Sequence, residues 1–186
     1  AARQAAEAAG VPVVPGSKSR LDTVEEAVSV AAELGYPVMI KAAAGGGGKG
    51  IRIADTEADL RKMAPQAQAE AKASFGDGGL YLERAINSPR HIEVQIMGDG
   101  TDAVHYFERE CSMQRRRQKV WEEAGASCLD QETRSHLCDT AVALAKAVNY
   151  VGAGTLEYLY DRETKEFFFI EMNTRIQVEH PVTEML

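Results

Sequence analysis

The alternation of apolar and polar residues divides the chain into helices and short strands. Helical segments bounded by capping residues and glycines are predicted over residues 2–9, 23–34, 56–74 and 130–148, with a further helix starting near Pro181. Short apolar or alternating runs predict strands over 37–41, 51–53, 80–86, 91–97, 103–110, 155–160 and 167–173. Residues 111–123 lack a clean period and are expected to form a loop. This pattern predicts an α+β fold with a small lobe ending near residue 85 and a larger lobe after it.

Local signals fix the ends of several elements. Thr23 and Glu26 have the spacing of a capping box, in which each side chain bonds the backbone of the other residue. Asp130 is a typical N-cap for the helix over 130–148. Pro65 lies inside the helix over 56–74, where it cannot donate a backbone hydrogen bond.

Composition and charge narrow the class of protein. The 186 residues are 45% hydrophobic and 26% charged, as in an ordinary soluble globular chain. The net charge of −7 argues against nucleic-acid binding, although residues 115–119 carry a basic run. We expect no membrane span, because Lys146 interrupts the most apolar late stretch. Three scattered cysteines predict neither a disulfide framework nor a zinc site, and they fit a reducing compartment. The chain opens without Met or a signal peptide, so we expect a processed or excised piece.

A glycine-rich loop is the first candidate for chemistry. Gly45, Gly47 and Gly50 satisfy the pattern GxGxxG, but a dinucleotide-binding fold requires a helix directly afterwards, and residues 51–53 predict a strand. A P-loop requires Ser or Thr where Gly50 stands. The remaining reading is a flap between antiparallel strands whose N–H groups cover phosphates, with a mobile hairpin tip as the alternative. Lys41 ends the preceding strand and is expected to neutralise nucleotide charge rather than simply to reach solvent.

An acidic hairpin follows late in the chain. Glu171 and Asn173 share one face of a strand, and a turn centred on Thr164 would place Glu157 directly opposite Glu171. Two opposed carboxylates and an amide oxygen suit Mg²⁺ or Mn²⁺, whereas the alternative is a proton shared between the carboxyl groups. Arg175, Gln177 and Glu179 are alternate residues, so their side chains would point to one side of an extended segment. Together they would suit the binding of a small oxyanion that must lose a proton.

Four segments of the chain resemble the biotin carboxylase family. They are Lys41 to Gly50 (KAAAGGGGKG), Pro89 to Gln95 (PRHIEVQ), Glu110 to Arg116 (ECSMQRR) and Glu171 to Glu184 (EMNTRIQVEHPVTE). The resemblance covers essentially the whole chain, and the last segment is the most specific. It implies an ATP-grasp fold with mainly antiparallel sheets flanked by helices and ATP between two lobes. Its expected parts are the end of a linker helix (1–12), a small lid lobe with the glycine flap (13–85) and the first part of a truncated large lobe (86–186).

The resemblance also implies roles for individual residues. The ATP contacts would be Lys41, Gly45, Gly46, Gly47, Gly48, Lys49, Gly50, Glu83, Arg84, Ile86, His91 and Gln114. Bicarbonate would be bound by Lys119, Arg175, Gln177, the backbone N–H of Val178, and Glu179, of which Lys119, Arg175 and Glu179 would be catalytic. Glu179 would be the base that deprotonates bicarbonate. The metal ligands would be Glu157, Glu171 and Asn173, in agreement with the argument from strand parity.

The expected function is ATP-dependent carboxylation of carrier-bound biotin with bicarbonate, in the biotin carboxylase part of an acyl-CoA carboxylase. The implied partners are a biotin carboxyl carrier domain, a carboxyltransferase and further copies of the full-length protein, in the cytoplasm or the mitochondrial matrix. Arg117 stands where the family most often has histidine, and Gly125 stands where it usually has proline. A preceding domain, a further phosphate lysine and a late arginine of the family lie outside this chain. Another bicarbonate-using ATP-grasp ligase and an inactive nucleotide-binding fragment therefore remain alternatives.

Overall fold

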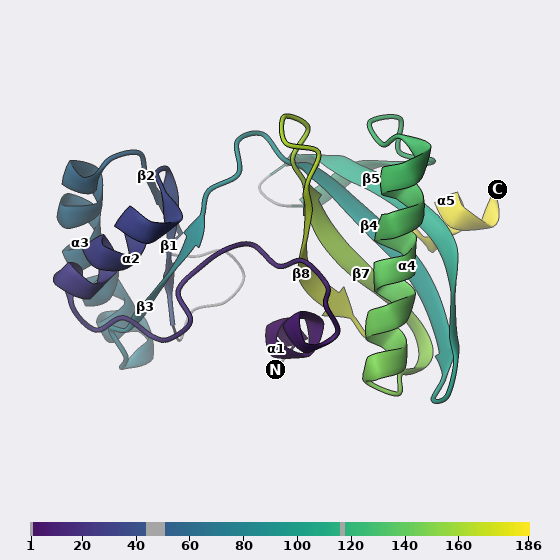
Figure 1. The fold of residues 1–186 in the computed structure, drawn as a ribbon, viewed down its shortest axis with the longest axis horizontal. Helices are drawn as coiled ribbons and strands as arrows, with labels where there is room; N and C mark the ends of the chain where they lie inside the picture. The colour runs from purple at the N-terminus through teal and green to yellow at the C-terminus, as the bar shows by residue number, and fades with distance from the viewer. Residues whose placement is uncertain (1, 44–50, 116–117) are drawn as a thin grey trace. The chain divides into compact units, whose positions relative to one another are not determined.

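The structure is a computed structural model that describes residues 2–43, 51–115 and 118–186 (Figure 1). The chain forms two compact units. The smaller unit contains Val14–Ile86, and the larger one combines Ala1–Val13 with Asn87–Leu186. Within the described residues, no helix is long and apolar enough to cross a membrane.

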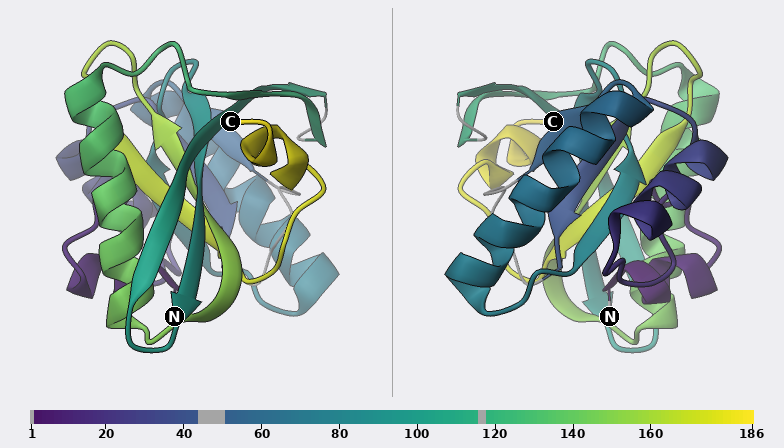
Figure 2. Two further views of the ribbon diagram at one scale, coloured as in Figure 1. Left: turned by 90° about the vertical axis from the view of Figure 1, so that its right-hand side faces the viewer. Right: turned by 90° about the vertical axis from the view of Figure 1, so that its left-hand side faces the viewer.

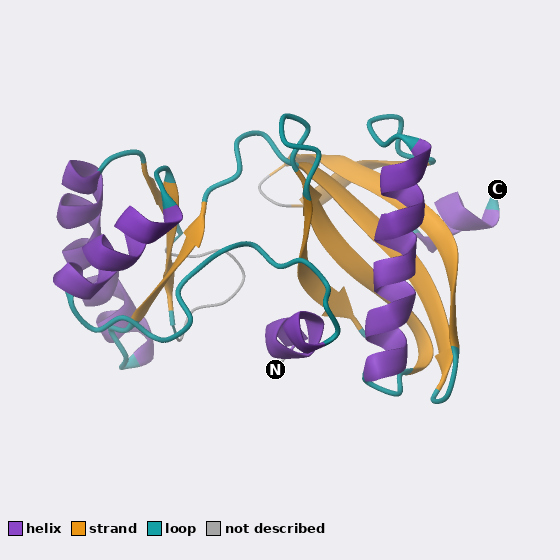
Figure 3. Ribbon diagram, viewed as in Figure 1, coloured by secondary structure: helices purple, strands orange, loops and turns teal. Residues whose placement is uncertain are grey.

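The smaller unit packs two helices on one antiparallel sheet. The strands β1 (Val38–Ala42), β2 (Arg52–Ala54) and β3 (Leu80–Arg84) lie in the order β2-β1-β3. The helices α2 (Val24–Leu34) and α3 (Glu57–Phe75) pack against each other and against the sheet, as the purple and orange ribbons of Figure 3 show. The core contains apolar side chains from all five elements. The face of β1 and β3 away from these helices carries alternate residues, including Lys41 and Glu83.

Capping signals predicted the helices of the smaller unit well. Thr23 and Glu26 form the predicted capping box at the start of α2. Thr56 caps α3, whose interior contains Pro65, and Gly76 ends it in the left-handed conformation that glycine favours. The strand β2 follows the glycine loop and runs antiparallel to β1, so the exclusion of a dinucleotide-binding turn is confirmed. The predicted flap itself, Gly45 to Gly50, lies outside the described residues.

The larger unit is built on a five-stranded antiparallel sheet in the order β6-β5-β4-β7-β8. Its strands are β4 (Arg90–Asp99), β5 (Ala103–Arg115), β6 (Gln118–Ala124), β7 (Val151–Tyr160) and β8 (Phe167–Asn173). The helix α4 (Gln131–Ala147) covers one face, where α1 (Ala2–Ala8) also packs, and the core lies beneath them. The short helix α5 (His180–Glu184) lies on the opposite face, against β5 and β6 (Figure 2).

One prediction for this unit is wrong. The expected loop over 111–123 is replaced by the end of β5 and by β6, which pair as a hairpin through Met113 and Trp121. Both of these side chains are exposed, and β6 buries none of its residues deeply. Strands are predicted from the alternation of apolar and polar residues. A strand that is solvated on both faces lacks this alternation, so its sequence resembles that of a loop.

Candidate active site

A row of charged residues crosses the sheet of the larger unit on the face opposite α4. Arg109 of β5 pairs in register with Glu93 of β4, which pairs with Glu157 of β7, which pairs with Glu171 of β8. Residues paired directly across neighbouring strands point to the same face of a sheet. The sequence therefore brings one arginine and three glutamates, far apart along the chain, into a single line.

The predicted opposition of Glu157 and Glu171 is confirmed. Near the turn, Tyr160 pairs with Phe167, one residue away from the register that a turn centred on Thr164 would give. One extra residue in β8, Ile170, then shifts the register and places Glu157 opposite Glu171. Asn173, the third predicted ligand, lies close by, because its Nδ2 donates to Glu157 Oε1 over 2.9 Å.

Lys119 is the centre of the site. It extends from β6, and its Nζ donates to Glu179 Oε1 over 2.6 Å, to Glu157 Oε1 over 3.0 Å and to Glu93 Oε2. The three carboxylates are buried. Burial by itself disfavours the charged ammonium, but the contacts with Glu179 and Glu93 outweigh it and raise the pKa of Lys119. Lys119 is therefore a permanent cation at neutral pH.

Glu179 has the protonation state that a base requires. Burial raises its pKa, but the hydrogen bond from Lys119 more than compensates, so the net pKa lies below the ordinary value. Its carboxylate is ionised at neutral pH. The alternative role for Glu179 is a salt bridge to Arg175. The structure instead pairs Glu179 with Lys119, whereas Arg175 is exposed and its Nη1 donates to the carbonyl oxygen of Ile176 over 3.0 Å.

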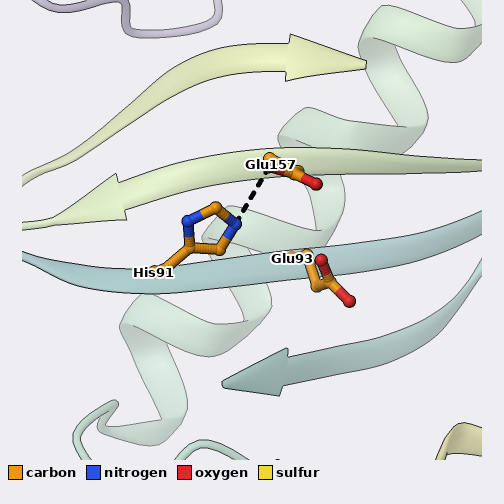
Figure 4. Close-up of side chains that lie close together, drawn as sticks. All are labelled: His91, Glu93 and Glu157. Carbon is orange, nitrogen blue, oxygen red and sulfur yellow. Dashed lines mark ion pairs between the residues drawn. The ribbon is translucent and has the colours of Figure 1, made fainter. Parts of the chain in front are cut away.

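Glu157 is held ionised by the groups around it. Burial opposes its charge, but the close approach of His91 and the ammonium of Lys119 lower the pKa of Glu157 to about 2. His91 Nε2 lies 3.0 Å from Glu157 Oε2, as the dashed line in Figure 4 shows. Gln177 Nε2 also approaches Glu157 Oε1, at 3.4 Å. The carboxylate is thus surrounded by donors of the protein itself.

The site offers oxygen ligands suited to a divalent cation. Glu93, Glu157 and Glu179 face Arg109, Lys119 and the imidazole of His91, which offset their charge. The exposed Glu171 lies opposite Glu157. His91, Glu93 and Glu157 also offer ligand atoms that all lie within 4.8 Å of one another (Figure 4). Carboxylate oxygens are the ligands that Mg²⁺ and Mn²⁺ prefer.

One buried polar atom at the site, Gln177 Oε1, lacks a hydrogen-bond partner among the described residues. His91 Nε2 is aligned poorly for a hydrogen bond, but it lies 3.0 Å from Glu157 Oε2. Buried polar atoms in folded proteins are normally satisfied, so Gln177 Oε1 is available to a ligand or a water molecule. Both residues were predicted as ligand contacts, His91 for the nucleotide and Gln177 for bicarbonate.

Other predicted site residues of the larger unit lie apart from this group. The side chains of Arg175 and Val178 are exposed, and that of Val178 retains 91% of its accessible surface. Gln114 is exposed as well, and its Nε2 donates to the carbonyl oxygen of Cys111 over 2.9 Å. The structure therefore gathers Lys119, Gln177 and Glu179, while the expected convergence of Arg175 with them is not seen.

The predicted nucleotide contacts of the smaller unit lie on and after β3 and at the end of β1. Lys41 forms an ion pair with Glu83 on the sheet face that the helices leave open. Arg84 ends β3, and Ile86 closes the unit. Lys41 thus pairs with a carboxylate of its own sheet, and its contact with phosphates stays a prediction.

Three residues of the site were missed by the sequence analysis. Glu93 and Gln95 share a strand face with His91, and the alternation of polar and apolar residues in His91 to Gln95 could have revealed them. Arg109 gave no comparable signal, since its partners lie on another strand. Its Nε donates to Glu93 Oε1 over 2.8 Å, and its Nη1 donates to Gln95 Oε1 over 3.0 Å.

Comparison with known proteins identifies the family of the chain. The whole chain, residues 1–186, matches the family described as carbamoyl-phosphate synthase L chain, ATP binding domain. The chain belongs to this family. The predicted α+β ATP-grasp fold, with mainly antiparallel sheets flanked by helices, is confirmed by the match and by the solved structures that resemble the chain.

Similar proteins in this family include biotin carboxylases. The chain is 53% identical to Biotin carboxylase 1 of Bacillus subtilis over 186 residues, which are 100% of this chain and 41% of that protein. A crystal structure of a biotin carboxylase–β,γ-ATP complex from Campylobacter jejuni shares 54% identity at a TM-score of 0.87, over 99% of this chain and 41% of that chain. A second structure is the biotin carboxylase domain of Hydrogenobacter thermophilus 2-oxoglutarate carboxylase, crystallised with MgADP, ADP and bicarbonate. It shares 50% identity at a TM-score of 0.85, and the match covers 98% of this chain and 40% of that chain.

Proposed function

We propose that the protein containing this chain uses ATP and bicarbonate to carboxylate biotin on a carrier protein. The observation that carries the proposal is the contact of Lys119 with Glu179 beside the opposed pair Glu157 and Glu171. Bicarbonate is already an anion, so removing its proton requires both a base and a nearby cation. Glu179 supplies an ionised carboxylate, and Lys119 supplies the charge that stabilises the product.

The remaining residues of the site fit the same reaction. Gln177, Arg175 and the N–H of Val178 would hold bicarbonate beside Glu179. Glu157, Glu171 and Asn173 would hold Mg²⁺, which neutralises charge on the transferred phosphoryl group when it is bound. Lys41 and the glycine loop, with Glu83, Arg84, Ile86, His91 and Gln114, would bind ATP.

The reaction balances without an oxidant or reductant. Glu179 takes the proton of bicarbonate, one oxygen of which attacks the γ-phosphorus of ATP, and ADP leaves, giving carboxyphosphate. Carboxyphosphate releases CO₂ and phosphate, and the phosphate takes the N1′ proton of biotin. The biotin enolate then captures CO₂. The nucleotide and bicarbonate bound by the Hydrogenobacter domain, at 50% identity, support this choice of substrates.

A second candidate is another bicarbonate-using ligase of the same fold, because the matching family is described by the carbamoyl-phosphate synthase L chain. The two differ in their acceptor. In the complete protein, ADP release should require bicarbonate and should rise when free biotin is added. Carbamoyl phosphate formed from an added nitrogen donor, with no response to biotin, would favour the second candidate. Absence of any bicarbonate-dependent turnover would contradict both.

We place this activity in an acyl-CoA carboxylase, where it would act with a biotin carboxyl carrier domain, a carboxyltransferase and further copies of itself in the cytoplasm or the mitochondrial matrix. The chain is also similar to a domain of a 2-oxoglutarate carboxylase, which is named for a keto acid, so the final acceptor of the carboxyl group needs its own test. The complete enzyme, given acetyl-CoA, propionyl-CoA, pyruvate and 2-oxoglutarate in parallel, should fix labelled bicarbonate into an acyl-CoA. Fixation into a keto acid alone would overturn this assignment.

A further inference from the structure

The helix α5 has little hydrophobic contact with the sheet on which it lies. None of its five residues, all within the described part of the chain, is buried. Val182 of this helix is half-buried, whereas the neighbouring Val178 and Met185 keep 91% and 86% of their accessible surface. Polar contacts with the sheet therefore contribute to where this helix lies. This matters because Glu179, the proposed base, is the residue from which α5 starts.

One of these contacts comes from Arg109, whose side chain is completely buried in β5. Its Nη1 donates to Thr183 Oγ1 of α5 over 2.7 Å, a short bond for a charged donor. The same guanidinium donates to Glu93, Gln95 and, at 3.4 Å, Thr155 Oγ1. A planar fork fixed by three partners in the sheet is a rigid point of attachment for the helix.

Thr183 follows Glu179 by one helical turn, so the two side chains lie on the same side of the segment. Val182 N–H donates to the carbonyl oxygen of Glu179 over 3.1 Å, which continues the turn between them. Fixing Thr183 against the sheet therefore directs Glu179 toward the sheet as well. Arg109 also holds Glu93 Oε1, which leaves Glu93 Oε2 to hold Lys119. Both partners of the Lys119–Glu179 contact are thus linked to one guanidinium.

We propose that Arg109 is a positioning residue, which fixes α5 through Thr183 and so sets the contact between Glu179 and Lys119. The proposal rests on the function proposed above for Glu179. Arg109 itself touches no expected substrate, and its effect is transmitted through Thr183 on one side and Glu93 on the other. A purely structural buried arginine would stabilise the sheet without affecting the geometry of the base.

Substitution of Arg109 would leave Glu93 buried without its cation and could prevent folding, so Thr183 carries the test. Thr183→Val keeps the shape of the side chain and removes the acceptor oxygen, while Thr183→Ser keeps the oxygen. In the nucleotide-free complete protein, hydrogen exchange of the peptide covering 179–186 should be several times faster in Thr183→Val than in wild type. The Ser variant should match wild type.

Kinetics supply the second measurement. In Thr183→Val, kcat for bicarbonate-dependent ADP release should fall by about tenfold, because a small misplacement of a catalytic group is costly. The KM for MgATP should remain within about twofold, and Thr183→Ser should restore kcat. The melting temperatures of the two variants are the control for a general loss of stability. Such a loss would not lower kcat while leaving the KM for MgATP unchanged.

The outcomes separate this inference from the proposed function. If wild type shows no bicarbonate-dependent turnover, the proposed function fails, and the exchange experiment alone then decides whether Arg109 fixes the helix. If wild type is active, unchanged kcat in Thr183→Val overturns the positioning role whether or not exchange is faster. Equal losses in the Val and Ser variants overturn it too, because the hydroxyl would not be responsible.

Discussion

Glu157 of β7 lies directly opposite Glu171 of β8, in a hairpin whose register is set by one extra residue in β8. Two carboxylates on opposed strand positions repel each other unless a cation or a proton lies between them. The pKa of Glu157 is strongly lowered, so a shared proton is disfavoured at neutral pH. Lys119 and His91 already offset the charge of Glu157, so the divalent cation expected here follows from the proposed reaction with ATP.

Removing one of these two carboxylates should weaken metal activation. In Glu171→Gln, the Mg²⁺ concentration that gives half-maximal ATP turnover should rise by more than about tenfold, because one anionic ligand has become neutral. Titration of Mg²⁺ at saturating ATP measures this. Glu163→Gln, at an exposed position in the turn of the same hairpin, is the matched control and should behave as wild type. Unchanged Mg²⁺ dependence in Glu171→Gln would remove Glu171 from the metal site.

The lysine at the end of β1 gives a separate prediction for the nucleotide. Lys41→Ala removes the ammonium expected to face the phosphates and leaves the half-buried Glu83 without this cation. Calorimetry on the complete protein should show ATP affinity reduced by about tenfold or more, since charge-assisted phosphate contacts are strong. Lys62→Ala, on the exposed side of α3, controls for net charge. Equal affinities for the two variants would contradict the assignment.

Lys119 should matter for stability as well as for activity. Lys119→Met leaves three buried carboxylates without their shared cation, and we expect the free energy of unfolding to fall by about 3 kcal/mol. Urea denaturation measures the change. Lys165→Met breaks an exposed ion pair with Asp130 at 3.5 Å and should have little effect, because exposed pairs contribute little. Similar losses in both variants would show that the Lys119 cluster is not a coupled buried group.

The low pKa of Glu157 predicts a dependence of stability on pH. Its pKa is about 2 in the folded chain against an ordinary 4.5, so the ionised form stabilises the fold above roughly pH 5. This contribution is lost as the pH falls toward 2. Unfolding of wild type and Glu157→Gln, measured with a metal chelator present, should therefore differ most near neutral pH and less at about pH 3. A difference that stays constant over this range would contradict the proposed ionisation.

Much of the fold was predictable because its signals are local. Thr23 and Asp130 were predicted as helix N-caps, and in the structure they cap α2 and α4. Strand parity correctly placed Glu171 and Asn173 on one face, because alternation along a strand is a local property, whereas the pairing of Glu157 with Glu171 also depended on the assumed turn and on the extra residue in β8. The exact position of the turn was not predictable, since the extra residue Ile170 shows no distinctive sequence signal.

The missed parts of the site depend on contacts between distant segments. Arg109 is buried because Glu93 offsets its charge, while Gln95 and Thr183 accept hydrogen bonds from its guanidinium. Nothing near Arg109 in the sequence distinguishes it from a surface arginine. Lys119, which the family resemblance placed in the same site as Glu179, contacts it from a strand that was expected to be a loop.

The central claim is that Glu179 and Lys119 activate bicarbonate for transfer to biotin. The most direct test follows the label of ¹⁴C-bicarbonate into free biotin with the complete protein at saturating MgATP. Wild type should form carboxybiotin, and Glu179→Gln should lose roughly a hundredfold or more of this rate while calorimetry shows ATP affinity nearly unchanged. Glu184→Gln, exposed on the same helix, should retain the wild-type rate. Labelling of biotin by Glu179→Gln at a rate within a few-fold of wild type would contradict the account.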